Sequence, residues 1–125
     1  MQTTTIPTVA AQDRALNQLV LDGRILEGFD QFYADDVVMQ ENAATPTVGK
    51  AANRAREVQF LDSIERFHGA TLVGSAVAGD RSYSEWVLDL TFKGGVRVKL
   101  EQVAVRRWRD GQIAEERFYY NASHA

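Results

Sequence analysis

Near the middle of this chain the spacing between apolar residues changes. Up to about His68 they recur every three or four positions, as on one face of an amphipathic helix. Beyond that point they alternate with polar residues, which is the pattern of a strand with one buried face. Helices first and strands last favour an α+β fold, in which three N-terminal helices pack on a curved antiparallel sheet.

Three helices and one short strand are predicted in the first half. The predicted helices are residues 10–21, ending at Asp22-Gly23, then 25–33 and 50–64. Between the second and third helices lie a strand, "VVMQEN" at 37–42, and the turn-forming segment "AATPTVG". Asp35 and Asp36 precede that strand and are predicted to be turn residues.

Four strands are predicted after His68. They are "ATLVGSAVAG", "RSYSEWVLDLTF", "GVRVKLEQVAVRRWR" and "QIAEERFYY", separated by three short segments that contain glycine. The last of these segments, Asp110-Gly111, is a strong signal for a two-residue hairpin turn. We therefore expect the last two strands to be antiparallel neighbours.

The turns also predict which residues of neighbouring strands are paired. Regular pairing from Arg109 and Gln112 gives Trp108 with Ile113, Arg106 with Glu115, Ala104 with Arg117, and Gln102 with Tyr119. The turn at Gly94 gives Trp86 with Gln102 and Leu88 with Leu100. The inner face, beneath the helices, is then Trp86, Leu88, Leu90, Phe92, Val96, Val98, Leu100, Gln102, Ala104, Ile113, Arg117 and Tyr119.

The opposite face of the predicted sheet combines charged and apolar residues. Its apolar members are more numerous than is usual on a face that contacts water, and they are Val87, Val103, Val105, Phe118 and Tyr120. We expect these five residues to form the interface of a homodimer.

Length and composition limit the classes of function. The 125 residues suit one domain, expected at 10–122 between a frayed start at 1–9 and a tail at 123–125. A net charge of −3 argues against nucleic acid as a partner despite the "RRWR" segment, and no apolar run is long enough to span a membrane. The chain has no cysteine, which fits the cytoplasm. We expect no metal and no cofactor.

Two segments, "FYADDVVMQEN…VGKAAN" and "RWRDGQI", resemble the SnoaL-like branch of the NTF2-like superfamily. The resemblance covers about Ala10 to Asn121. It implies the cone-shaped α+β fold of ketosteroid isomerases, polyketide cyclases and scytalone dehydratases. It implies no single function, because this fold supports several reactions and also binding modules.

In the isomerases of this superfamily, a carboxylate near the end of the first strand abstracts a proton next to a carbonyl group. The resemblance places that base at Glu41. The two positions that hold the oxyanion in those enzymes correspond to Asn17 and Ala104, which do not match. Histidine chemistry like that of scytalone dehydratases would require His68 to point inward.

For the remaining candidates, functional and structural interpretations are both open. Glu41 is either a base in an apolar cone or a strand-end residue that contacts Arg117 or solvent. Arg117 either anchors a substrate oxygen or belongs to a buried ion pair. Gln102 either contacts a ligand or bonds a neighbour. The other predicted ligand contacts, which could equally be core, are Met39, Phe60, Trp86, Leu88 and Tyr119.

The sequence thus favours a cofactor-independent protein that binds a small hydrophobic carbonyl compound and isomerises, cyclises or dehydrates it. Glu41 would take the proton, and Arg117 or Gln102 would hold the oxyanion. The alternative is a dimeric binding or assembly module without catalysis, whose polar inner residues satisfy one another.

Overall fold

The computed structural model describes residues 7–121 and has three helices and six strands. The helices are α1 (Val9–Leu21), α2 (Ile25–Phe32) and α3 (Lys50–Asp62). The strands are β1 (Tyr33–Glu41), β2 (Thr47–Val48), β3 (Ile64–Ala78), β4 (Arg81–Phe92), β5 (Arg97–Arg109) and β6 (Gln112–Tyr120). Most of the predicted frayed start, and the predicted tail, lie outside the described residues.

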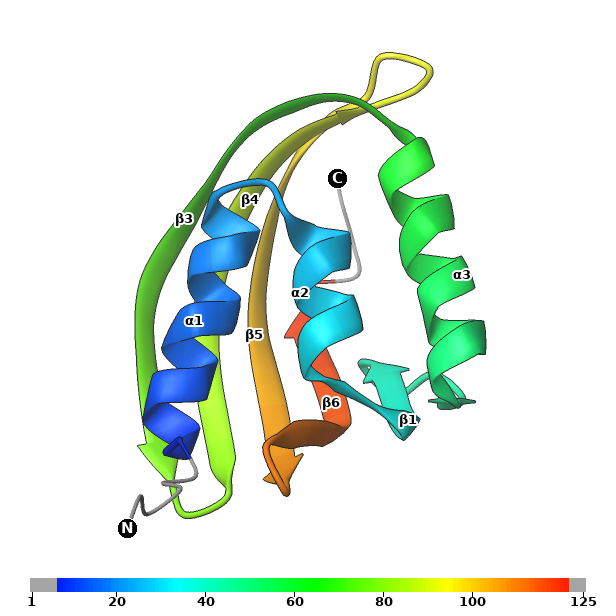
Figure 1. Ribbon diagram of the computed structural model, residues 1–125. Coiled ribbons are helices and arrows are strands. Elements are labelled where there is room, and N and C mark those ends of the chain that lie inside the picture. The colour runs from blue at the N-terminus through cyan, green and yellow to red at the C-terminus, as the bar shows by residue number, and fades with distance from the viewer. Residues whose placement is uncertain (1–6, 122–125) are drawn as a thin grey trace, which may run out of the picture.

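The strands form one sheet in the order β2-β1-β6-β5-β4-β3. Neighbours are antiparallel except β1 and β6, which are parallel. Figure 1 shows the long strands curving around α1 and α2, with α3 on the far side of the concave space. The predicted α+β fold with helices on a curved sheet is confirmed. Among the described residues, no helix is long and apolar enough to cross a membrane.

Two strands begin earlier than the alternation of residues predicts. β1 starts at Tyr33, directly after α2, so Asp35 and Asp36 belong to a strand and the turn prediction is wrong. An ion pair with β5 holds this start, because Nη2 of Arg109 donates to Oδ1 of Asp36 at 2.6 Å. β3 starts at Ile64 rather than near residue 70, and Ile64 pairs with Phe92.

The hydrophobic core fills one end of the concave space. Phe29 stacks on Tyr33 with ring centroids 4.5 Å apart, and Phe32 meets Trp108 edge to face at 5.9 Å. Gly28 lets α1 and α2 approach closely, since a Cβ atom there would lie 2.8 Å from Cδ1 of Leu16. This core anchors both helices and leaves the other end of the concave space open.

A bulge in β6 changes which of its side chains point inward. The pairs Arg109 with Gln112 and Trp108 with Ile113 are as predicted, but Arg107 then pairs with Glu115. Ala114 is therefore an extra residue without a partner in β5, as in a β-bulge. From there on, every residue of β6 is displaced by one position relative to the prediction.

Because of the bulge, four residues of β6 lie on the opposite face from the one predicted. Phe118 and Tyr120 pair with Ala104 and Gln102, so they lie on the inner face and not in the outer patch. Arg117 and Tyr119 lie on the outer face, where the guanidinium group of Arg117 stacks 4.6 Å from the centre of the Tyr119 ring.

The same displacement changes the partner of Arg106. That residue pairs with Glu116 instead of the predicted Glu115. The predicted pairs between β4 and β5, Trp86 with Gln102 and Leu88 with Leu100, are confirmed.

Candidate functional site

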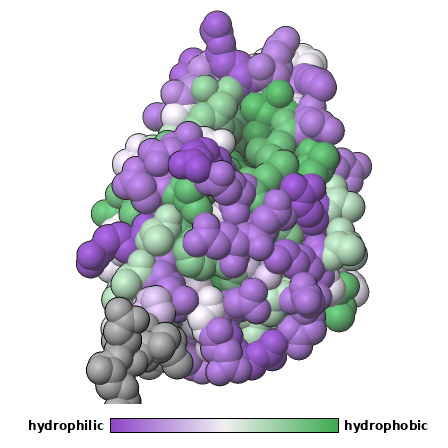
Figure 2. Space-filling model, viewed as in Figure 1, coloured by the Kyte–Doolittle hydropathy of each residue, from purple (hydrophilic) through white to green (hydrophobic). Residues whose placement is uncertain are grey.

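A pocket of about 580 Å³ lies between α3, the two N-terminal helices and the inner face of the sheet. Figure 2 shows hydrophobic side chains gathered in a hollow toward the upper end of the molecule. Apolar residues from six elements make most of the wall: Ile25, Phe29, Met39, Phe60, Trp86, Leu88, Leu100 and Phe118. A cavity of this size and lining suits a small hydrophobic ligand.

Most of the residues predicted to contact a ligand line this pocket. Met39, Phe60, Trp86 and Leu88 are in the wall, and so is Gln102. Tyr119 does not line the pocket and is 44% exposed, because the bulge turns it outward.

Two residues predicted for the outer face, Phe118 and Tyr120, occupy the inner wall beside Gln102. His68 is exposed, with its Nε2 atom 2.7 Å from Oγ1 of Thr91, and does not line the pocket.

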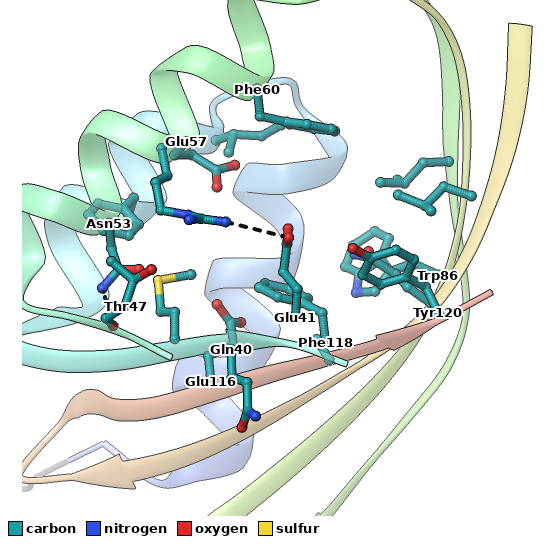
Figure 3. Close-up of a pocket in the computed structure, with 18 of the residues that line it drawn as sticks. Gln40, Glu41, Thr47, Asn53, Glu57, Phe60, Trp86, Glu116, Phe118 and Tyr120 are labelled. Atoms are coloured by element: carbon teal, nitrogen blue, oxygen red, sulfur yellow. Dashed lines mark hydrogen bonds and ion pairs between the residues drawn. The ribbon is translucent and has the colours of Figure 1, made fainter. Parts of the chain in front are cut away.

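Glu41, the last residue of β1, lines the pocket at its solvent-exposed side. Its side chain is 51% exposed, and Oε2 lies 3.6 Å from Nη2 of Arg56. In Figure 3 a dashed line from Glu41 marks this contact. Burial, followed by the charge of the Glu41 carboxylate and a hydrogen bond to it, raises the pKa of Tyr120 on the neighbouring strand β6. Glu41 and Tyr120 thus bring two oxygen-bearing groups to the same part of the pocket.

Glu57 is a second carboxyl group in the pocket, and it was not predicted. It projects inward from α3 above Glu41 (Figure 3) and is partly buried. Burial raises its pKa to about 7, and the negative charges of Glu116 and Glu41 add to this effect. Within residues 7–121, no hydrogen bond or ion pair to another side chain is found for Glu57. Its protonation therefore changes near neutral pH.

A buried ionic network forms the floor of the pocket. Nε of Arg106 donates to Oε2 of Glu116 at 2.8 Å, and its Nη1 donates to Oδ1 of Asp13 at 2.8 Å. The Tyr33 hydroxyl donates to the other Glu116 oxygen at 2.5 Å. Burial, followed by the charge of Glu116, raises the pKa of Tyr33 well above its ordinary value. These four residues come from α1, β1, β5 and β6 and connect those elements.

Asn17 belongs to the same network. Its side-chain oxygen accepts from Arg106 at 2.7 Å, and its amide donates to Asp13 and to Ser84. Ala104, the other position compared with the isomerases, lines the pocket without a polar side chain. Neither residue supplies a free hydrogen-bond donor to a ligand.

Asn53 holds the start of α3 against β1 and β2. Its amide donates to the carbonyl oxygens of Gly49 at 2.8 Å, Thr47 at 3.0 Å and Val37 at 3.4 Å. One turn later on the same side of the helix comes Glu57, and Phe60 follows. Asn53 thereby fixes which face of α3 is turned to the pocket.

The apolar side chains of α3 do not all lie on the face turned to the pocket, as Ala51 and Ala55 show. Both alanines are exposed, whereas Asn53, Glu57 and Phe60 line the pocket. The signal that could have located Glu57 was its spacing of four from Asn53 and three from Phe60. The alternation of inward and outward residues along β6 assigns Glu116 and Tyr120 to the wrong face, because the bulge at Ala114 precedes both. Within the part of the chain described, no three His, Asp or Glu side chains are grouped to hold a metal ion.

Comparison with solved structures gives the class of protein. A protein from Mesorhizobium loti, proposed to be a SnoaL-like polyketide cyclase, is 29% identical with a TM-score of 0.81, covering 91% of this chain and 100% of that one. A proposed polyketide cyclase from Xanthomonas campestris is 23% identical, with 90% of each chain covered and a TM-score of 0.74.

A third similar structure is a protein from Catenulispora acidiphila with a ketosteroid isomerase-like fold, in complex with trimethylamine. It is 19% identical, with 95% of this chain and 89% of that one covered and a TM-score of 0.69. The last two similarities establish the fold only. Together with the sheet and pocket, these comparisons define an NTF2-like cone.

Residues 6–120 match the SnoaL-like domain, so the chain belongs to the SnoaL-like family. A search of curated proteins found no match.

Proposed function

We propose that this SnoaL-like protein binds a small hydrophobic carbonyl compound in the cone and removes a proton from the carbon next to the carbonyl group. The observation that supports this most directly is the apolar pocket with a carboxylate, Glu41, at its open side. Isomerisation, cyclisation and dehydration of such compounds can all begin with this proton transfer.

Glu41 is the proposed base. Its carboxylate oxygens are the proton acceptors that lie at the open side of the pocket. Trp86, Met39, Phe60 and Leu88 would hold the apolar body of the compound in the wall that they line. The Gln102 amide, on β5, would donate a hydrogen bond to the substrate oxygen as the negative charge develops.

The test measures the proton transfer without requiring the natural substrate. The protein is incubated in D₂O with 2-tetralone, a bicyclic ketone, and the loss of the α-proton signals is followed by NMR. We expect exchange above the rate in buffer, and a loss of at least tenfold in Glu41→Gln. Asp62→Asn, which alters an exposed carboxylate of α3 outside the pocket lining, should exchange like the wild type. Equal rates for Glu41→Gln and the wild type would refute the role of Glu41.

We also propose that the outer face of the sheet forms the interface of a homodimer. The alternative function, a binding module without catalysis, depends on this dimer. Val87, Val103 and Val105 lie on this face and are partly exposed, and Tyr119 joins them there. Sedimentation at micromolar concentration tests the association. A dimer that binds hydrophobic ketones but does not exchange their α-protons would favour the binding module.

A further inference from the structure

We infer that Glu57 is a second catalytic residue, whose protonated carboxyl group donates a hydrogen bond to the carbonyl oxygen of the bound compound. This inference rests on the proposed function, in which Glu41 acts on the carbon next to that carbonyl. It gives Glu41 and Glu57 different tasks, set by their different surroundings.

The position of Glu57 places its carboxyl group inside the pocket. It projects from α3 between Asn53 and Phe60, and in Figure 3 it points into the space bounded by Glu41 and the sheet. Glu41 approaches the same space from the end of β1. A compound held between them can contact one carboxyl group with its oxygen and the other with its adjacent carbon.

The two arginines that line the pocket, Arg56 and Arg106, are already paired. Arg106 on the floor donates through Nε to Glu116 and through Nη1 to Asp13 and Asn17. Arg56, the residue before Glu57 in α3, lines the pocket with its Nη2 atom 3.6 Å from Oε2 of Glu41. Neither side chain forms an ion pair with Glu57 in the described residues, so no positive charge offsets the cost of ionising it.

The other titratable groups facing Glu57 also favour its neutral form. Glu41 from β1 and Glu116 from β6 carry negative charge, and burial disfavours a further one. Tyr33 on the floor and Tyr120 on the wall are neutral, since burial raises the pKa of each. A neutral carboxyl group can donate a hydrogen bond and costs less to bury in an apolar site than a carboxylate does.

The inference also accounts for two mismatches with the isomerases. Asn17 is occupied by Asp13, Ser84 and Arg106, and Ala104 has no donor. Glu57 would supply from α3 the donor that these positions lack. In the proposed step, Glu41 accepts the α-proton and the C–H electron pair forms the carbon–carbon double bond. The carbonyl electron pair moves to oxygen, which accepts the hydrogen bond or the proton of Glu57.

Binding of 2-tetralone between pH 5.5 and 8.5, followed by calorimetric titration, tests the inference without a measurement of the reaction rate. We expect wild-type affinity to be constant below about pH 6 and to fall above pH 7, as Glu57 loses its proton. Glu57→Gln keeps a donor that does not ionise, so its affinity should be close to the low-pH wild-type value at every pH. Glu57→Leu removes the donor and should bind roughly fivefold more weakly at pH 6.

Two outcomes would overturn the inference. One is wild-type affinity that does not change with pH, and the other is Glu57→Leu binding as tightly as the wild type at pH 6. The latter would mean that Glu57 disfavours the ligand only through its charge. Because binding is measured apart from α-proton exchange, a protein that shows this pH profile without exchange would retain the donor role and lose the proposed reaction.

Discussion

Nε of Arg106 lies 2.8 Å from Oε2 of Glu116, and the two side chains are only 4% and 0% exposed. Forming such an ion pair costs the desolvation of both charges. The attraction between them offsets this cost only when further hydrogen bonds satisfy the remaining polar atoms. Here Asp13, Asn17 and Tyr33 provide them. The network therefore keeps the floor of the pocket polar and in a single arrangement.

Arg106→Leu should destabilise the fold strongly. It leaves the Asp13 and Glu116 carboxylates buried without a cation, and losing one partner of a buried pair costs about 3–5 kcal/mol. Urea unfolding followed by circular dichroism measures the change. The neighbouring Arg107, paired with Glu115 on the outer face at 3.2 Å, is the matched control. Arg107→Leu should cost less than about 1 kcal/mol, and equal losses in the two variants would contradict this account.

Glu57→Gln should become stabilising as the pH rises. The carboxyl group has a pKa of about 7 in the folded protein against an ordinary value of 4.5, so between these values the folded state keeps a proton that the unfolded chain releases. The contribution of Glu57 to the wild-type free energy of unfolding is therefore largest below pH 4.5 and is lost as the pH rises to 7. Between pH 5 and pH 8, the free energy of unfolding of the variant should rise relative to that of the wild type by on the order of 1–3 kcal/mol. Urea midpoints at both pH values provide the measurement, with Asp62→Asn as the control.

Phe118→Ala and Tyr119→Ala should differ in their effect on ligand binding. Phe118 lines the pocket, whereas Tyr119 is on the outer face beneath Arg117. Truncating Phe118 removes apolar contact and should weaken 2-tetralone binding about tenfold, and Tyr119→Ala should leave it unchanged. The reverse result would mean that β6 follows regular pairing from the Asp110-Gly111 turn.

Val103→Glu should abolish the proposed dimer. Val103 is partly exposed in the middle of β5 on the outer face, and a charge buried there without a partner opposes association. Val96→Glu is the control, because Val96 is 62% exposed beside the glycine turn between β4 and β5. Sedimentation velocity should show a monomer for Val103→Glu and a dimer for the control. A monomeric wild type would eliminate the interface.

Much of the fold could be predicted because local signals agreed with tertiary structure. Asp110 and Gly111 have φ angles of +51° and +79°, as a two-residue hairpin of this type requires, and the sequence contains the two residues that favour them. The two pairs nearest that turn were correct. Ala114 gives no comparable signal, since an alanine suits either a regular strand or a bulge. Its position depends on packing of β6 against both β5 and β1.

The candidate site was less predictable, because its side chains too are positioned by packing between distant parts of the chain. Glu41 was located by the resemblance to the isomerases, near the end of the first strand, and it does line the pocket. Glu57 was not, because apolar periodicity identifies the helix face that packs against a core. A pocket wall instead combines polar and apolar groups, as Asn53, Glu57 and Phe60 do on α3. Such a face resembles a surface until the opposite wall is known.

The bulge at Ala114 has a consequence for changes in chain length. Removing Ala114 would give β6 regular pairing with β5 while leaving Glu116, Phe118 and Tyr120 opposite the same partners. Removing a residue between Phe118 and Tyr120 would instead exchange inward and outward side chains at the end of the strand. A single deletion is thus tolerable for ligand recognition at Ala114 and disruptive at Tyr119, five residues later. Homologues should therefore be aligned here by pocket contacts, with the gap placed at Ala114.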